Sequence, residues 1–267
     1  MPDVWSGITE LDAATQLRLA GILELRGADP QQQAMRGVFL DDIPFPPEAR
    51  VLELGCGTGV LTRRLARRPG IGPVIGVDVA PFLLAKAREL AAGLSIAFRH
   101  GDARALPYER PEFDVAIFDS TLCHVPQPEK ALAEAFRVLR PGGCLAAFDG
   151  DYATTTVALG EQDPLQACAE AMMAGSVHDR WLMRRLPALL RAQGFEVLRF
   201  RSHGYSEMPG TGYMLTIVDR GAEMLQAAGR IGAETAAALK AEARRRVEAG
   251  TFFGHIAYVD VIARRPG

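Results

Sequence analysis

The sequence has almost no net charge, because 30 lysine and arginine residues are balanced by 32 aspartate and glutamate residues to give a formal charge of −2. A protein that binds nucleic acid through its phosphates usually carries a strong basic excess. The one dense basic run, residues 244–246, lies in a stretch rich in alanine and glutamate that is typical of a solvated helix. We therefore expect no nucleic-acid partner.

The sequence also lacks paired cysteines and long apolar runs. Its four cysteines, at positions 56, 123, 144 and 168, form neither a CxxC pair nor the spacing of a metal site, so we expect buried, reduced thiols and no bound metal. No apolar run approaches the ~20 residues of a membrane-spanning helix. The first residues do not have the basic and apolar regions of a secretory signal. These absences predict a cytoplasmic protein without a membrane span.

The composition that is present, 48% hydrophobic and 23% charged over 267 residues, is that of a folded domain. The length suits one large α/β domain, and no stretch has the composition of a linker. We divide this single domain into an N-terminal helical cap (1–37), a cofactor-binding core (38–150) and a substrate-side region (151–267). Apolar residues recur at helical spacing in the cap: Ile8, Leu11, Leu19, Ile22 and Leu23.

The core alternates between predicted strands and predicted helices. The strands cover residues 50–54, 74–78, 95–99, 113–119 and 144–149, and the helices cover 59–68, 81–92 and 128–139. Strands that are separated by helices run parallel in a doubly wound sheet. Beyond the core we expect a helical region at 164–193, a strand at 195–205, helices at 211–228 and 233–249, and a last strand at 255–263.

The strongest chemical signal is a glycine-rich turn after the first predicted strand, residues 53–59 (ELGCGTG). Glycine lets the backbone turn sharply and approach a ligand closely, and the following helix presents free N–H groups to an anion. A tight turn without a ligand would use the same residues. A nicotinamide fingerprint would require glycine at position 60, which is Val60, so the spacing disfavours a nicotinamide oxidoreductase.

Acidic residues follow the next three predicted strands. Asp78 ends the second strand about 20 residues beyond the glycine turn, where an acid binds ribose hydroxyls in dinucleotide folds, or else it caps the helix that follows. Asp102 follows the third strand, where it could accept a proton from an adenine amine or simply form a turn. Asp119 ends the fourth strand. The carboxyl ends of parallel strands meet at one edge of the sheet, where α/β sheets bind ligands.

Five motifs in this order resemble the class I S-adenosylmethionine-dependent methyltransferases. They are the glycine turn that begins at Glu53 and residues 74–78, 101–103, 113–117 and 139–143. The resemblance covers residues 45–150 and extends to the remainder in outline. It implies S-adenosylmethionine as the cofactor and an α/β fold: a doubly wound, mostly parallel seven-stranded Rossmann-like sheet whose last strand runs antiparallel between the fifth and sixth.

The resemblance also implies roles for individual residues in cofactor binding. The glycine turn would cradle the methionine part, and its acid would help to place the amino group. The acid that ends the second strand would hold the ribose, the acid after the third would meet the adenine amine, and residues that end the fourth would line the methyl group. These roles fall on Glu53, Gly55, Gly57 and Gly59, on Asp78 with Val79, on Asp102 with Ala103, and on Asp119 with Ser120.

The catalytic requirements of methyl transfer point to a second set of residues. The acceptor must be aligned with the sulfonium carbon and water excluded, and an acceptor oxygen or carbon can need a general base. His124, which follows the fourth strand, is the best candidate for that base, although a histidine packed against the cofactor would satisfy the same sequence. Asp149, His203 and Tyr205 follow the fifth and sixth strands, and we expect them on the acceptor side.

Several features favour a small-molecule acceptor. Residues 119–122 (DSTL) differ from the Asn/Asp-Pro-Pro-Tyr/Phe pattern of methyltransferases that act on planar amines. Residues 125–126 and the turn at 140–143 resemble methyltransferases of quinones of the ubiquinone and menaquinone type, sterols and polyketides. Methionines adapt well to apolar ligands, and those of the substrate-side segments favour an aromatic or lipophilic acceptor: Met172, Met173, Met183, Met208, Met214 and Met224.

Other functions stay open from the sequence. A protein with these motifs could bind the cofactor without transferring a methyl group, and then catalyse a rearrangement or regulate a partner. It could also methylate RNA or protein. An arsenite methyltransferase needs several cysteines near the methyl group, and only Cys123 is a candidate. The leading hypothesis is therefore a small-molecule methyltransferase.

Overall fold

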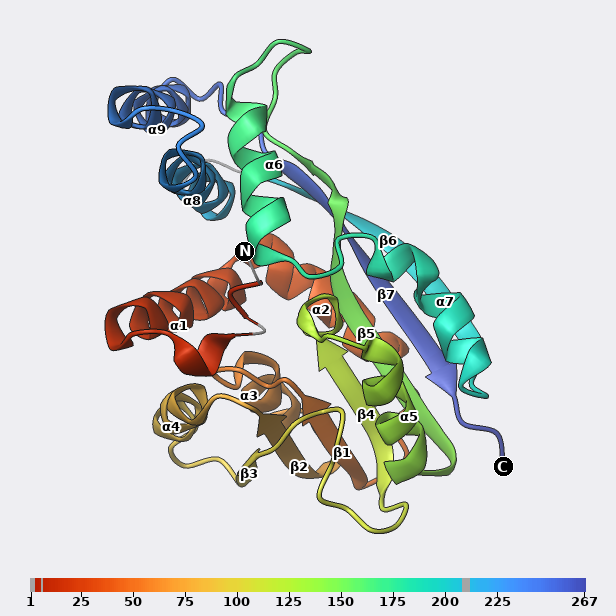
Figure 1. Ribbon diagram of the computed structural model, residues 1–267. Coiled ribbons are helices and arrows are strands. Elements are labelled where there is room, and N and C mark those ends of the chain that lie inside the picture. The colour runs from red at the N-terminus through yellow and green to blue at the C-terminus, as the bar shows by residue number, and fades with distance from the viewer. Residues whose placement is uncertain (1–2, 6, 208–211) are drawn as a thin grey trace.

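The computed structural model describes residues 3–5, 7–207 and 212–267 (Figure 1). Met208 of the methionine group, residue 211 at the predicted start of a helix, and residues 1–2 and 6 of the predicted cap lie outside these residues.

The described residues form one seven-stranded sheet in the order β3-β2-β1-β4-β5-β7-β6. The strands are β1 (Ala49–Leu54), β2 (Ile71–Asp78), β3 (Ile96–His100), β4 (Phe113–Asp119), β5 (Leu139–Thr156), β6 (Glu196–Ser206) and β7 (His255–Arg264). The pairs from β3 to β5 are parallel, and β7 is antiparallel to both β5 and β6. The predicted Rossmann-like fold with an antiparallel last strand is confirmed.

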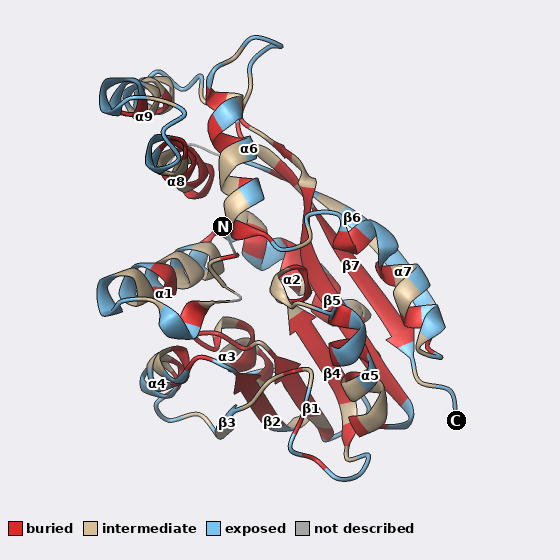
Figure 2. Cartoon of the chain, in the orientation of Figure 1, coloured by how far each residue is buried: buried red, intermediate tan, exposed pale blue. Residues whose placement is uncertain are grey.

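The central strands are buried on both faces because their sequences are continuous apolar runs. Every residue of β4 between Val115 and Phe118 is buried, as is the stretch of β1 from Val51 to Leu54. Helices α3 (Val60–Ala66), α4 (Pro81–Leu90) and α5 (Pro128–Val138) connect the parallel strands, and their buried faces cover the sheet (Figure 2). The edge strand β6 instead alternates between partly buried and exposed residues along most of its length.

The cap begins later than the apolar spacing predicts. A short 3₁₀ turn covers Ile8–Glu10, and α1 (Ala13–Ala28) starts after Asp12, whose carboxylate accepts a hydrogen bond from the Thr15 N–H at 2.9 Å. An aspartate at this position satisfies a free N–H of the first turn, so it fixes the start of the helix. Helix α2 (Pro30–Asp42) follows after Asp29, which caps it in the same way.

The predicted helical region at 164–193 is two helices, α6 (Leu165–Ser176) and α7 (Leu182–Ala192). The chain leaves the helix at Val177, which has an extended conformation. Backbone N–H groups of the break bond elsewhere: that of Asp179 donates to the Cys123 carbonyl at 2.9 Å, and that of His178 to the Asp3 carboxylate at 2.8 Å. The helical spacing of apolar residues does not indicate that these N–H groups have partners in distant segments, so the sequence did not predict the break.

Strand β5 is much longer than residues 144–149, because it pairs with β7 as far as Thr156 opposite His255. Beyond this end of the sheet, α8 (Tyr213–Ala227) packs against both α6 and α9 (Ala233–Glu248), and the three form a separate helical layer (Figure 1). The carboxyl ends of β1, β2 and β4 face the N-terminal segment and α1, and the candidate site lies between them.

Candidate active site

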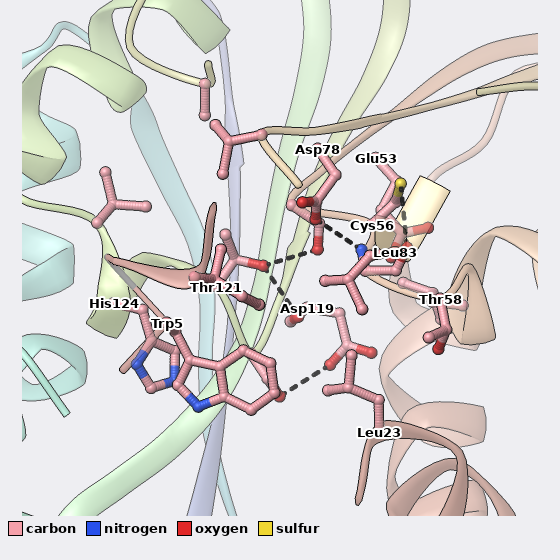
Figure 3. Close-up of a pocket in the computed structure, with 18 of the residues that line it drawn as sticks. Trp5, Leu23, Glu53, Cys56, Thr58, Asp78, Leu83, Asp119, Thr121 and His124 are labelled. Atoms are coloured by element: carbon pink, nitrogen blue, oxygen red, sulfur yellow. Dashed lines mark hydrogen bonds between the residues drawn. The ribbon is translucent and has the colours of Figure 1, made fainter. Parts of the chain in front are cut away.

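A cavity of about 370 Å³ opens at the carboxyl ends of the parallel strands (Figure 3). This volume is within the range of small-molecule sites. The predicted residues that line it are Glu53, Gly55, Gly57, Asp78, Val79, Asp102, Ala103, Asp119, Ser120 and His124. The structure thus brings together residues from four separate strand ends. Gly59 lies just behind the lining, as the left-handed N-cap residue of α3.

The glycine turn has a backbone that only glycine adopts readily. Gly55 has a φ of 72°, and a Cβ atom there would lie 2.2 Å from Cγ2 of Thr121. Gly57 has a φ of 53°, and its N–H donates to Oδ2 of Asp78 at 2.8 Å. The turn is therefore shaped by the neighbouring strand ends and leaves its open side to the cavity.

Asp78 joins the ends of β1 and β2. Its second oxygen, Oδ1, accepts from the Ala80 N–H at 2.8 Å just before α4, so the residue both supports the glycine turn and shapes the helix start. The carboxylate is 8% exposed, and burial raises its pKa. Each oxygen has a further lone pair, so Asp78 could also accept from a hydroxyl in the cavity.

Glu53 is the most deeply buried acid of the cavity, at 2% exposed. Burial raises its pKa to about 8, although the hydroxyl of Thr62, which donates to Oε2, acts in the opposite direction. The group is therefore protonated at neutral pH when no cation is nearby. A positive ligand group would favour its charged form.

Two of the predicted acids are paired with arginines that the sequence motifs do not include. Asp119 accepts from Nε of Arg36 at 2.7 Å and from Nη2 at 3.1 Å, and both side chains are nearly buried. Asp102 is bound at 2.6 Å by Arg104 from the same turn, and this hydrogen bond lowers the pKa of Asp102. Arg36 shares the buried face of α2 with Gln32, Met35, Phe39 and Leu40, and no sequence motif marks it as a partner of Asp119.

His124 belongs to a 3₁₀ turn (Leu122–His124) directly after β4. Its Nδ1 lies 2.7 Å from Oδ2 of Asp3, and its ring lies 5.9 Å from the ring of Trp5. Figure 3 shows the indole of Trp5 next to the imidazole of His124 on one side of the cavity. The N-terminal segment, whose side chains carry no recognisable motif, therefore forms part of the wall.

The three predicted acceptor-side residues do not line this cavity. Asp149 is buried and accepts from the Gly150 N–H at 2.8 Å, and its Oδ1 lies 3.3 Å from Sγ of Cys123. His203 pairs with the fully buried Asp260 at 2.6 Å. The hydroxyl of Tyr205 donates to Asp29 at 3.0 Å. Their assignment to acceptor binding stays a prediction.

The lining has the chemistry that an adenosyl and methionine group needs. Apolar Val79, Leu83 and Ala103 lie at one end of the cavity beside the acids that follow β2 and β3. The hydroxyl oxygen of Thr58, on the glycine turn, is buried and has no hydrogen-bond partner in the described part of the chain. A buried polar atom without a partner is costly, so this position suits a polar ligand atom. The residues present therefore fit S-adenosylmethionine.

Comparisons with known proteins agree with this geometry. Residues 51–143 match the family model of the methyltransferase domain. The chain is 39% identical over 97 residues to the ubiquinone biosynthesis O-methyltransferase of Pseudomonas fluorescens strain SBW25, which is 35% of this chain and 41% of that protein. It spans less than half the length of the first curated relatives that it matches.

Solved structures share the fold over most of the chain. A Bacillus halodurans protein with a provisional methyltransferase assignment has a TM-score of 0.62 at 19% identity, covering 86% of this chain and 98% of its own. The [4+2]-cyclase SpnF has a TM-score of 0.57 at 25% identity, covering 90% and 85%. Within the described residues, no helix combines the length and apolar character needed to cross a bilayer.

Proposed function

We propose that the chain is a class I S-adenosylmethionine-dependent methyltransferase and that it transfers a methyl group from that cofactor to a small-molecule acceptor, a proposal that the matched methyltransferase domain and the similar O-methyltransferases support. The observation that carries this proposal is the single cavity that joins the glycine turn, the acids after β2 and β3, and His124. We further propose that the chain acts as one domain in the cytoplasm, where its four free, buried cysteines would stay reduced.

In this function the glycine turn and Glu53 would hold the methionine part of the cofactor, and Asp78, Val79 and Ala103 would hold its adenosine part. The bound cofactor supplies a methyl group on a positively charged sulfur. Since no metal or redox step is needed for such a displacement, the protein has to align the acceptor and keep water out. Trp5, which lines the cavity, would help to keep water out.

His124 would take the proton of the acceptor hydroxyl. Because Asp3 is an acceptor at Nδ1, the neutral imidazole carries its proton on Nδ1 and leaves Nε2 free to accept one. As the acceptor oxygen takes up the methyl group, the bond from that carbon to sulfur would break and leave a neutral thioether, and Nε2 of His124 would accept the acceptor's proton. Asp3 then stabilises the resulting imidazolium, as a carboxylate does in other acid–base pairs.

The proposal is tested by cofactor binding followed by product analysis. Isothermal titration should show binding of S-adenosylmethionine and S-adenosylhomocysteine below millimolar concentration, and none of NADH. Incubation with methyl-labelled cofactor and a panel of phenols, quinones and amines should then transfer label to a phenol or quinone. NADH binding without binding of either adenosyl compound would contradict the proposal.

One comparison favours a second candidate, a reaction without methyl transfer. The protein SpnF, which is 25% identical over most of both chains, is a [4+2]-cyclase. A chain of this fold could therefore bind an adenosyl cofactor and promote a rearrangement. Binding of S-adenosylhomocysteine together with conversion of a test substrate without uptake of label would support this candidate over the first.

A further inference from the structure

Arg26, in the last turn of α1, lines the cavity without a partner for its charge. It is half-buried, and within the described part of the chain it has neither a hydrogen bond nor an ion pair. Other arginines around the cavity are engaged: Arg36 by Asp119, Arg63 by Glu24 and Arg104 by Asp102. Arg26 is therefore the cation of the lining that remains available to a ligand.

The surroundings of Arg26 are polar, but no carboxylate of the described residues hydrogen-bonds to it. The groups that act on its charge include Tyr258, Tyr213, Tyr152, Asp119 and Asp149. Burial raises the pKa of Tyr152 and of Tyr258, so these hydroxyls are uncharged at neutral pH. Asp119 already accepts two hydrogen bonds from Arg36, and Asp149 accepts from the Gly150 N–H. The guanidinium of Arg26 therefore keeps its donors available to an anionic ligand.

The neighbouring tyrosines belong to the segments that surround the acceptor side. Tyr152 is on β5, Tyr213 begins α8 and Tyr258 is on β7, and none of them is near the glycine turn in sequence. The Tyr258 and Tyr213 hydroxyls lie 3.3 Å apart and share one hydrogen bond, so one proton of this pair remains for a third group. Arg26 itself lines the cavity, and a guanidinium with free donors binds a carboxylate through two parallel hydrogen bonds.

We propose that Arg26 anchors the carboxylate of the methyl acceptor, and that the acceptor is a small hydroxylated aromatic acid. This inference rests on the proposed methyl transfer, because it places the ligand in the same cavity as His124. Apolar Leu23, one turn earlier on α1, and Trp5 line the same cavity and give an aromatic body its contact surface. The methionine part of the cofactor also has a carboxylate that Arg26 could bind. The test therefore separates binding of the acceptor's carboxylate from binding of the cofactor's.

The experiment uses a matched pair of probes, 3,4-dihydroxybenzoate and the neutral 3,4-dihydroxybenzamide. Each is titrated into the full chain saturated with S-adenosylhomocysteine, and binding is followed by the fluorescence of the two tryptophans, Trp5 and Trp181. The wild-type protein should bind the acid about 10-fold more tightly than the amide, as expected for one charge-assisted bidentate contact. Binding of S-adenosylhomocysteine is measured first, and its failure counts against the proposed function and not against Arg26.

Variants locate the effect. Arg26→Gln should bind acid and amide equally while its affinity for S-adenosylhomocysteine stays within about 2-fold of wild type, and Arg26→Lys should retain part of the preference. Arg18→Gln, on the same helix but with its side chain 53% exposed, should behave as wild type. If circular dichroism shows that Arg26→Gln does not fold, the Arg26→Lys protein tests the inference instead. Its preference for the acid over the amide should be weaker than that of wild type.

Three outcomes overturn the inference. The first is equal wild-type affinity for the two probes, and the second is no binding of either at about 10 mM. The third is an Arg26→Gln or Arg26→Lys variant that loses affinity for S-adenosylhomocysteine but keeps the preference for the acid, which would assign Arg26 to the cofactor.

Discussion

The carboxylate of Asp3 lies 2.7 Å from Nδ1 of His124, although 121 residues separate the two in the sequence. The same oxygen of Asp3 accepts from the His178 N–H at 2.8 Å, and the other accepts from the Trp5 N–H at 2.9 Å. One buried carboxylate therefore holds together the N-terminal segment, the turn after β4 and the break between α6 and α7. These are the parts of the wall that face the acceptor in the proposed function.

Asp3→Asn should slow methyl transfer without weakening cofactor binding. The amide keeps the shape of the side chain but removes the charge that stabilises the imidazolium. We expect kcat to fall about 10- to 100-fold, with KM for S-adenosylmethionine unchanged.

The matched control for this variant is Asp12→Asn, which changes an exposed carboxylate of the same segment and keeps a residue suited to the start of α1. It should leave kcat as in wild type. An Asp3→Asn protein with the kcat of wild type would assign Asp3 a purely structural role.

The buried Glu53 should make the folded protein less stable as pH rises. Its pKa is about 8 in the folded protein and about 4.5 when unfolded. Between these values the unfolded chain has released the proton and the folded chain has not, so the free energy of unfolding falls by about 1 kcal/mol per pH unit. Glu53→Gln should remove this slope. Urea unfolding of both proteins at pH 5.5, 6.5 and 7.5 measures the difference, and parallel curves would contradict it.

Cofactor binding should be coupled to the same proton. A cationic amino group next to Glu53 favours its carboxylate form, so binding below the pKa of about 8 releases a proton. The affinity for S-adenosylmethionine should therefore rise by up to about 10-fold from pH 6 to pH 7, and the Glu53→Gln protein should not show this rise. Titration calorimetry in two buffers of different ionisation enthalpy counts the released proton directly.

Gly55→Ala should destabilise the folded protein far more than Gly70→Ala, which places alanine in a similar left-handed conformation but meets no neighbouring atom. A left-handed alanine costs about 1–2 kcal/mol, and at Gly55 the new Cβ would also lie 2.2 Å from Thr121 Cγ2. Gly70 has a similar φ of 77° with no atom within 4 Å of the added Cβ, so Gly70→Ala isolates the backbone cost. Thermal unfolding should show a drop at least twice as large for Gly55→Ala. Equal drops would mean that Thr121 moves aside freely.

Removing one partner of the Arg36–Asp119 ion pair should destabilise the folded protein strongly. Both side chains are nearly buried, at 5% and 7% exposed, so Arg36→Met leaves an unpaired buried carboxylate and should cost about 3 kcal/mol. The double variant Arg36→Met, Asp119→Leu should cost less than the sum of the single changes. Lys86→Met, which breaks a largely exposed pair with Glu89, should cost under about 1 kcal/mol. Additive single and double effects would show that the two groups do not interact.

The parts of the molecule that the sequence predicts are those encoded locally. The apolar strands and the glycine turn determine their own conformation, and β4 has the predicted bounds, Phe113–Asp119. The acids after the strands reach one cavity because parallel strands end at the same edge. The glycine spacing alone distinguished the cofactor class, since Val60 stands where a nicotinamide site needs glycine.

What the sequence does not predict depends on contacts between distant segments. Arg26 and Arg36 occur in helices whose apolar spacing indicates only a packed face, and nothing local shows that their charges turn towards the cavity. Asp3 has no motif around it. His203 follows a strand as an active-site residue would, but the fully buried Asp260 on the neighbouring strand takes up its Nε2. For Arg36, Asp3 and His203, the deciding partner is more than 50 positions away in the sequence.

The bonds that the Asp3 carboxylate makes to Trp5, His124 and His178 also set an order of events during synthesis. Residue 3 is made first among the partners, and 175 residues separate it from His178. At about 5–20 residues per second, the ribosome needs roughly 10 to 35 seconds to make that stretch. The glycine turn and the ends of β1, β2 and β4 are complete well before then. The nascent chain can therefore form the part of the cavity that holds the cofactor first. The part proposed for the acceptor forms only when the N-terminal segment, made early, contacts the segment at His178, made much later.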